Sequence, residues 1–205
     1  MKKLFVAVLV IAIALMGASV AMAAISTTLH NMSSNSTNAI KGDIGEICVY
    51  CHTPHGGAQA AGQPLWNRSN PAASAFTPYS CTSTTTVGTL NAGSLVCLSC
   101  HDGTTAVNSL LNYQGATHTG GGAGTLVTGI YAIANDGASL TNDHPVGVPI
   151  PNNANFNATQ PLLSQYLVSG QVECSTCHAV HGAGFASFLR ASNADSALCL
   201  DCHNK

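Results

Sequence analysis

The sequence predicts a single domain that is mostly irregular chain, with short α-helices and very little β-structure. Three observations support this fold class. Only 5% of the 205 residues are aromatic, so side chains alone supply little bulk for a core. Stretches rich in Ser, Thr, Asn and Gly, such as residues 33–39, 82–88 and 117–124, interrupt any periodic pattern. Finally, eight of the nine cysteines fall into four identical short motifs, which ties the chain down at four places.

Composition excludes two broad classes of protein. Disordered chains combine high net charge with few apolar residues, whereas this chain has a formal charge of −2 and is 46% hydrophobic. Nucleic-acid binding needs clustered Lys and Arg, and the whole sequence contains six of them. We therefore expect an ordered domain and no nucleic-acid partner.

The start of the chain has the three parts of a secretory signal peptide, which are a basic start, an apolar run and a small-x-small cleavage site. They occupy Lys2 and Lys3, residues 4–16, and Ala21-Met22-Ala23. A transmembrane anchor is the alternative, and it requires about 20 apolar residues. No cysteine precedes Cys48, so no thiol is available for a lipid anchor near the cleavage site. We expect residues 1–23 to be removed and residues 24–205 to be exported without a membrane anchor, to an extracellular, cell-surface or alternatively periplasmic location.

Each of the four cysteine motifs reads C-x-x-C-H. They comprise Cys48, Cys51 and His52; Cys97, Cys100 and His101; Cys174, Cys177 and His178; and Cys199, Cys202 and His203. This spacing is the attachment signature of c-type haem, in which two thiols bond to the vinyl groups and the adjacent His binds the iron. Zinc ribbons and disulfides are the alternatives, but zinc does not require a His after every second Cys. The motifs predict four haem c groups with iron, around which the irregular chain is wrapped.

Six-coordinate iron in four haems needs four further ligands. The expected mature chain contains one methionine, Met32, so histidine must supply at least three of them. Five histidines lie outside the motifs: His30, His55, His118, His144 and His181. His118 lies in a Gly-rich stretch with nothing to hold an imidazole rigid, so it is the expected surplus residue. We expect bis-histidine ligation through the other four.

His55 and His181 each follow a motif histidine by three residues. Three residues span at most roughly 10 Å, and the chain would have to pass around a macrocycle already bonded to it. If they are ligands, each must therefore bind the iron of a neighbouring haem. Such sharing predicts closely packed haems, as electron transfer between macrocycles requires.

These motifs resemble the multihaem cytochromes with doubled C-x-x-C-H motifs. Within that group the chain is similar to the extracellular tetrahaem cytochromes that polymerise into conductive filaments, the OmcE type. The resemblance is carried by residues 30–33, 48–55, 97–104, 142–146 and 174–182. It implies bis-histidine haems, a low reduction potential and little regular secondary structure. Cys81 has no place in this pattern, and is expected to be either a buried thiol or available for an intermolecular bond.

Short helices are expected at the four motifs and at residues 105–111, 160–168 and 185–190. The predicted function is electron transfer, with redox partner proteins or extracellular acceptors. A soluble periplasmic shuttle is the first alternative. A multihaem reductase is the second, but it needs an iron with an open position, whereas here the candidate ligands exceed the irons.

His30 lies close to the expected mature N-terminus, and chain termini are the segments least tied to their own domain. If His30 ligates a haem of a neighbouring subunit, a head-to-tail contact follows, and such contacts propagate into open fibres. The alternative is that His30 folds back to an iron of its own chain. The first arrangement predicts self-association into filaments.

Overall fold

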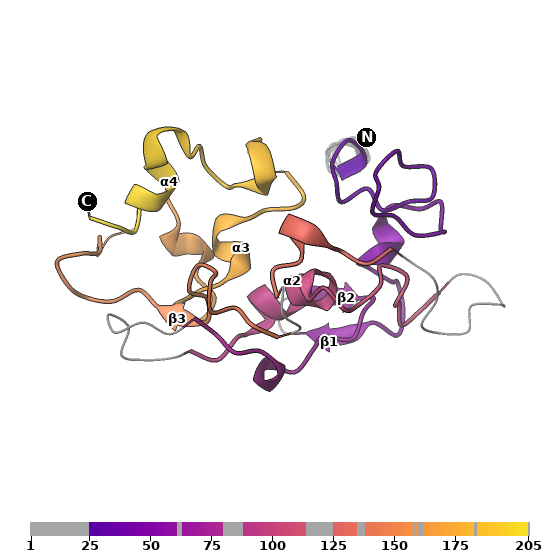
Figure 1. The fold of residues 1–205 in the computed structure, drawn as a ribbon, viewed down its shortest axis with the longest axis horizontal. Coiled ribbons are helices and arrows are strands. Elements are labelled where there is room, and N and C mark those ends of the chain that lie inside the picture. Colours follow the sequence, from indigo (N-terminus) through magenta and orange to yellow (C-terminus); the bar gives the residue numbers. More distant parts are fainter. Residues whose placement is uncertain are drawn as a thin grey trace, which may run out of the picture.

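The computed structural model describes residues 25–60, 63–79, 88–113, 125–134, 138–157, 159, 162–182 and 184–204. The N-terminal segment and α4 lie toward opposite ends of the long axis of the molecule, and the chain between them passes back and forth along that axis (Figure 1). The expected signal peptide lies outside the described residues, as do Cys81 and His118. Within the described part of the chain, no helix is long and apolar enough to cross a membrane.

Regular structure comes in short pieces joined by loops. The helices are α2 (Ala92–His101), α3 (Cys174–Cys177) and α4 (Ala197–Leu200), and the strands are β1 (Ala58–Ala60), β2 (Gln63–Trp66), β3 (Val148–Pro149) and β4 (Gln171–Val172). Single 3₁₀ turns lie at Cys48–Tyr50, Ala73–Ala75, Gly129–Tyr131, Ser164–Tyr166, Ala186–Phe188 and Ala194–Ser196. β1 pairs antiparallel with β2 through an irregular register, and β3 pairs antiparallel with β4.

Helix α2 lies at the centre of the molecule and carries the second motif (Figure 1). It begins after Asn91, whose side-chain oxygen accepts a hydrogen bond from the backbone N–H of Gly93 at 3.0 Å. Gly93 lies against α3, because a Cβ atom there would come within 2.6 Å of Ser175 Oγ and 3.0 Å of Glu173 Cβ. The absence of a side chain at Gly93 therefore lets the helices of the second and third motifs approach closely.

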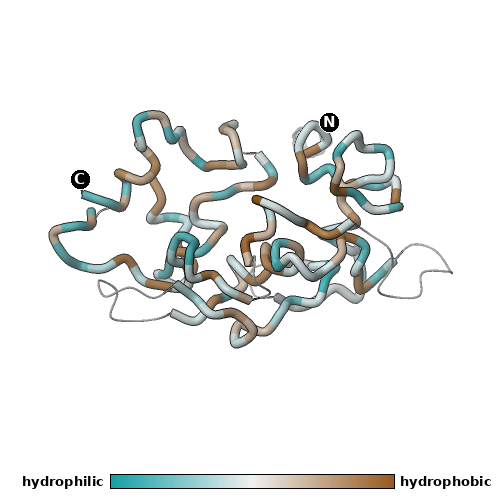
Figure 2. Tube along the Cα trace, in the orientation of Figure 1, coloured by the Kyte–Doolittle hydropathy of each residue, from teal (hydrophilic) through white to brown (hydrophobic). Residues whose placement is uncertain are grey.

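Apolar side chains pack in two small clusters on either side of α2. One contains Met32, Ile44, Val49, Tyr50, Val107 and Val127, and the other contains Phe76, Leu90, Leu98, Ala134 and Leu140. Cys51 and Cys100 pack against the first cluster. Figure 2 shows that apolar residues occur in short stretches along the whole trace rather than in one continuous layer. The side chains of the described residues thus form two small cores rather than a single large one.

The prediction of a helix at residues 105–111 is wrong, because backbone groups of this segment form hydrogen bonds with side chains instead of the regular bonds of a helix. The Asp102 carboxylate accepts hydrogen bonds from the backbone N–H groups of Thr104 and Thr105, which holds this segment in a turn. The carbonyl oxygens of Ala106 and Val107 accept from the Arg68 side chain instead of from a following helical turn. In the other two expected segments the structure has one 3₁₀ turn each, at Ser164–Tyr166 and Ala186–Phe188.

Candidate haem-binding site

The first three motifs each place their two cysteines on or at the end of one short helical turn, and in the fourth Cys199 lies in α4 and Cys202 just after it. In the second and third motifs the pairs lie on α2 and α3, and in the first the turn is the 3₁₀ helix Cys48–Tyr50. Residues three apart lie on the same face of such a turn, so both thiols of a pair point to the same side. All eight motif cysteines are free of disulfides. Among the described residues, no group of three or more His, Cys, Asp and Glu side chains is placed to hold a metal ion.

Three motif histidines each face a histidine from outside the motifs. The ring centroids are 6.0 Å apart for His30 and His101, 5.9 Å for His52 and His181, and 6.2 Å for His144 and His203. A metal ion bound by two opposed imidazole nitrogens, at about 2 Å from each, holds the ring centroids about 6 Å apart. The residues present therefore fit an iron held between two histidines at three places.

Hydrogen bonds at Nδ1 orient three histidine rings, two from the pairs above and the ring of His178. His101 Nδ1 lies 2.6 Å from the carbonyl oxygen of Tyr131, and His178 Nδ1 lies 2.7 Å from that of Ser187. His144 Nδ1 lies 3.0 Å from the carbonyl oxygen of Pro145. A carbonyl only accepts, so Nδ1 carries the proton and Nε2 keeps its lone pair. That tautomer is the one a metal-binding histidine requires.

His30 is the most perturbed of these histidines. Burial, assisted by the nearby rings of His101, His181 and His178, lowers the pKa of His30 to about 4. Burial and the neighbouring His52 also lower the pKa of His181. The His30 ring stacks on Phe188 with centroids 4.6 Å apart, which fixes its plane. Both side chains are thus neutral at pH 7, as iron ligands must be.

The sequence predicts that His55 is a haem ligand, and in the structure its side chain is exposed. Within the described residues, neither His55 nor His178 has an opposed imidazole at the spacing of the three pairs above. Met32 is buried in the first apolar cluster. The fourth pair is therefore the part of the predicted ligand set that the described residues do not bring together.

The four attachment sites follow one another in chain order. Burial and the nearby Cys100 sulfur together raise the pKa of Cys51 to about 12. Cys97 shares a hydrogen bond with Cys174, which raises the pKa of Cys97 and lowers that of Cys174. Burial and the nearby Cys202 raise the pKa of Cys177 to about 11. Consecutive motifs are thus neighbours in space, which fits a continuous row of haems.

The first and third motifs are built in the same way. In the first, Thr53 N–H donates to Leu65 O at 2.9 Å and Asn67 N–H donates to Cys51 O at 2.8 Å. In the third, Ala179 N–H donates to Phe188 O at 2.7 Å and Arg190 N–H donates to Cys177 O at 2.9 Å. The returning segments share a positive φ, 58° at Leu65 and 59° at Phe188. In this correspondence His55 and His181 occupy equivalent positions, each three residues after the motif histidine.

Apolar side chains lie exposed beside the motifs, where an apolar macrocycle would cover them. Ile130 and Tyr131 are 85% and 43% exposed, although the Tyr131 carbonyl contacts His101. Phe185 and Leu200 are 45% and 44% exposed near the third and fourth motifs. These surfaces are the expected lining of sites that bind a large apolar group.

Two buried charged side chains beside the motifs are not predicted by the sequence to belong to the site. Arg68 is 1% exposed, and its side chain donates hydrogen bonds to residues that follow α2 in the chain, such as Val107 O at 2.8 Å. Glu173 is also 1% exposed, and it accepts a hydrogen bond from Ser94 Oγ on α2. Neither residue has a distinctive local sequence context, since their partners are remote in the chain. Only the folded arrangement identifies them.

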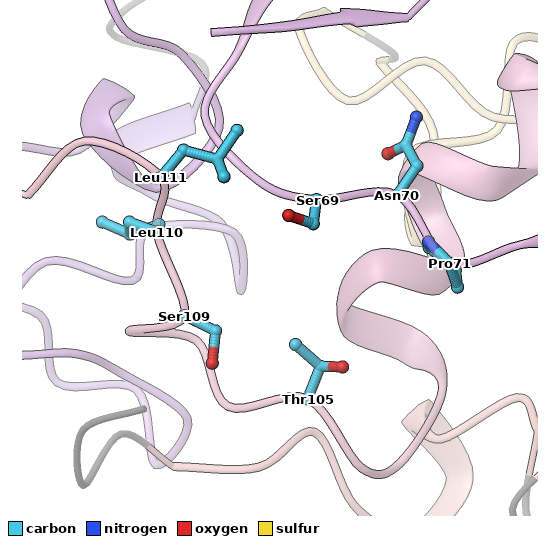
Figure 3. Close-up of a pocket in the computed structure, with 7 residues that line it drawn as sticks. All are labelled: Ser69, Asn70, Pro71, Thr105, Ser109, Leu110 and Leu111. Atoms are coloured by element: carbon cyan, nitrogen blue, oxygen red, sulfur yellow. The ribbon is translucent and has the colours of Figure 1, made fainter. Parts of the chain in front are cut away.

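A pocket of about 350 Å³ lies beside Arg68 and is lined by Ser69, Asn70, Pro71, Thr105, Ser109, Leu110 and Leu111. Figure 3 shows residues 69–71 facing residues 105–111 across it. No lining residue belongs to an attachment motif. Its two walls are the segments that the Arg68 side chain joins, through Ala106 O and Val107 O.

Comparison with known proteins agrees with the motif chemistry. A family model for the doubled CXXCH motif matches residues 167–205, which contain the third and fourth motifs. No curated protein matches the chain. The doubled motif indicates covalently bound haem c with iron and supports electron transfer as the function. The match, together with the paired histidines, supports a multihaem c-type cytochrome.

Proposed function

We propose that the protein carries electrons along four c-type haems, each ligated by two histidines, and that it is a carrier rather than an enzyme. The observation that carries this proposal is the set of three opposed histidine pairs, at centroid distances of 5.9–6.2 Å. Each pair combines one motif histidine with one histidine from elsewhere in the chain. Haem iron supplies reversible one-electron chemistry when bound, and two histidines leave it no open position for a substrate.

The chain's own residues hold and orient these groups. The paired cysteines of each motif provide two covalent anchors, and the adjacent histidine binds from the same side. His30, His181 and His144 approach from remote segments, so each ties two parts of the chain together. The carbonyl oxygens of Tyr131 and Ser187 keep the rings of His101 and His178 in the metal-binding tautomer.

His55 is the proposed partner of His178. It occupies the position in the first motif that His181 occupies in the third, and His181 already faces the first motif through His52. A reciprocal arrangement would supply the missing fourth pair and leave His118 as the surplus histidine. The exposed position of His55 also permits it to reach a haem of another molecule.

The proposed biological form is the subunit of an extracellular filament. His30 was the expected ligand across the subunit junction, but it faces His101 of its own chain at 6.0 Å, which supports the intramolecular alternative. The ligand position opposite His178 is instead the proposed junction. In the filament, the His55 that ligates opposite His178 would come from the next subunit rather than from the same chain, which would make a heterologous, propagating contact. A soluble periplasmic shuttle would have the same haem ligation without that contact.

Electron paramagnetic resonance on the oxidised holoprotein tests the carrier proposal. We expect low-spin signals from four haems and no stoichiometric high-spin iron. A stoichiometric high-spin signal would overturn it in favour of an enzyme with an open iron. Negative-stain microscopy of native secreted material separates the two biological forms, because filaments support the subunit proposal and isolated monomers support the shuttle.

A further inference from the structure

Arg68 is a buried cation that the haem-ligation scheme does not use. Its side chain is 1% exposed. Nε and Nη2 donate to Ser99 O at 3.3 and 3.1 Å, Nη2 also donates to Ala106 O at 2.8 Å, and Nη1 donates to Val107 O at 2.8 Å. A guanidinium cannot be deprotonated in a protein, so this charge persists at every accessible pH.

Among the described residues, the hydrogen-bond acceptors of Arg68 are all neutral carbonyl oxygens. These hydrogen bonds satisfy the donors of the guanidinium but do not cancel its positive charge. Burying a charge without a counter-ion is costly, so its retention needs a reason beyond packing. A nearby group that gains negative charge when the protein accepts an electron would provide a reason to retain the charge of Arg68.

Arg68 lies at the junction between the first two attachment motifs. Its acceptor Ser99 stands between Cys97 and Cys100 of the second motif. The preceding residue, Asn67, binds the first motif, because its backbone N–H donates to Cys51 O at 2.8 Å and its side chain donates to Val49 O at 2.7 Å. The dipeptide Asn67-Arg68 therefore holds the two motifs together and places the cation between them.

Arg68 lies beside the cysteines of both motifs. Ser99, whose carbonyl oxygen accepts from Nε and Nη2 of Arg68, immediately precedes Cys100. Asn67, which binds Cys51 O, immediately precedes Arg68. Cys51 and Cys100 are residues through which the first two haems would be bonded to the chain.

We propose that Arg68 is a fixed buried charge that raises the reduction potentials of the haems attached at Cys48/Cys51 and Cys97/Cys100 above the values they would otherwise have. This inference rests on the proposed function. Reduction adds one negative charge to a haem, and a buried positive charge nearby stabilises the reduced state. Arg68 thus favours electrons on the N-terminal half of the row of haems, relative to the half held by the third and fourth motifs.

Potentiometric titration of the holoprotein, with the haems resolved by their spectra, tests the proposal. Arg68→Gln removes the charge and should lower the potentials of the first two haems. The expected change is about tenfold in the ratio of oxidised to reduced haem at a fixed applied potential, equivalent to about 59 mV for one electron. Arg68→Lys keeps the charge and should retain most of the wild-type potentials, although it loses the forked hydrogen bonds.

Arg190→Gln is the matched control. Arg190 also donates to a motif carbonyl, through Nε to Ser175 O at 2.9 Å, but the motif it contacts is the third, and its guanidinium lies over the Tyr166 ring. It should leave the first two potentials unchanged. Equal shifts in Arg68→Lys and Arg68→Gln would overturn the charge mechanism in favour of packing. Unchanged potentials in Arg68→Gln, or an equal shift at all four haems, would overturn it as well.

If Arg68→Gln does not assemble with four haems, the pH dependence of the haem potentials in Arg68→Lys still tests the proposal. A buried lysine loses its charge at a lower pH than a free one, whereas arginine does not. Between about pH 7 and pH 10, the first two potentials should fall further in Arg68→Lys than in the wild type. Identical pH profiles would contradict the proposal. Spin state and haem content, measured on the same samples, report separately on the proposed function.

Discussion

At the scale of single residues, the site depends on imidazoles that are neutral, oriented and opposed. Nδ1 contacts to Tyr131 O and Ser187 O orient two motif rings, and burial keeps His30 unprotonated. Each feature has a separate physical cause, namely a backbone acceptor in the first case and desolvation in the second. Substitutions at single residues should therefore affect one haem each.

His181→Ala should open the haem attached at Cys48 and Cys51, because the His181 ring faces His52 and not His178. Attachment should remain intact, since it requires only the thiols. Carbon monoxide difference spectra should show one new binding site per molecule. The site should persist when Cys174 and Cys177 are also replaced by Ala, and its disappearance in that background would show that His181 serves the haem of its own motif.

Glu173→Gln should change the pH dependence of stability. Burial raises the pKa of Glu173, although the hydrogen bond from Ser94 opposes the increase. A carboxyl whose folded-state pKa is raised stabilises the fold when protonated, and that contribution is lost as pH rises above the unfolded-state value. The wild type should thus lose more stability than Glu173→Gln between about pH 4 and pH 7. Thermal midpoints of the holoproteins measure this, and parallel profiles would contradict it.

At the scale of secondary-structure elements, α2 and α3 form the central contact of the molecule. Gly93 lets α3 approach α2, and Ser94 Oγ accepts a hydrogen bond from Cys174 N–H at 3.0 Å across the contact. The elements are short, so their stability comes from such contacts and from the covalent anchors rather than from helix propensity. Substitutions that disturb the contact between α2 and α3 should therefore alter stability more than substitutions that change only helix propensity.

Gly93→Ala tests that ranking. Alanine in a helix interior favours the helix by about 1 kcal/mol over glycine. The added methyl group would, however, lie 3.0 Å from both Glu173 Cβ and Val168 Cγ2, and such overpacking costs about 1–3 kcal/mol. We expect a net loss of stability in denaturant titrations of the holoprotein. Gly45→Ala, whose nearest neighbour is Asn35 Nδ2 at 3.5 Å, is the control and should show no such loss.

At the scale of the whole molecule, consecutive attachment motifs are neighbours in space, because Cys51 is near Cys100, Cys97 shares a hydrogen bond with Cys174, and Cys177 is near Cys202. Among the described residues, the two apolar clusters involve residues 32–146, whereas the segment around the fourth motif is held by hydrogen bonds. Asn157 N–H donates to Cys202 O at 2.8 Å, and the Asp201 carboxylate accepts from Leu162 and Leu163 N–H at 3.0 and 2.9 Å. The C-terminal end should therefore depend most on its haem.

Replacing Cys199 and Cys202 by Ala should release one haem and loosen the C-terminal end without unfolding the centre. Hydrogen exchange should accelerate at residues 144–157 and 194–204, and protection in α2 should be retained. Replacing Cys97 and Cys100 by Ala is the comparison, and it should loosen the centre, because α2 contacts both apolar clusters. Loss of α2 protection in the C-terminal variant would show that the row folds as one cooperative unit.

The sequence by itself determined the attachment chemistry, because a C-x-x-C-H motif places all its reacting groups within one helical turn. It also limited the remaining ligands to five histidines and Met32, and it predicted that His181, if it is a ligand, serves another motif's haem. Only the tertiary structure decided that His30 faces His101 of its own chain, and that Arg68 lies buried between two motifs. Those contacts join residues remote in the chain, and local pattern carries no information about which remote groups meet. The missing helix at residues 105–111 has the same cause, because a distant arginine takes the carbonyl groups that a helix would need.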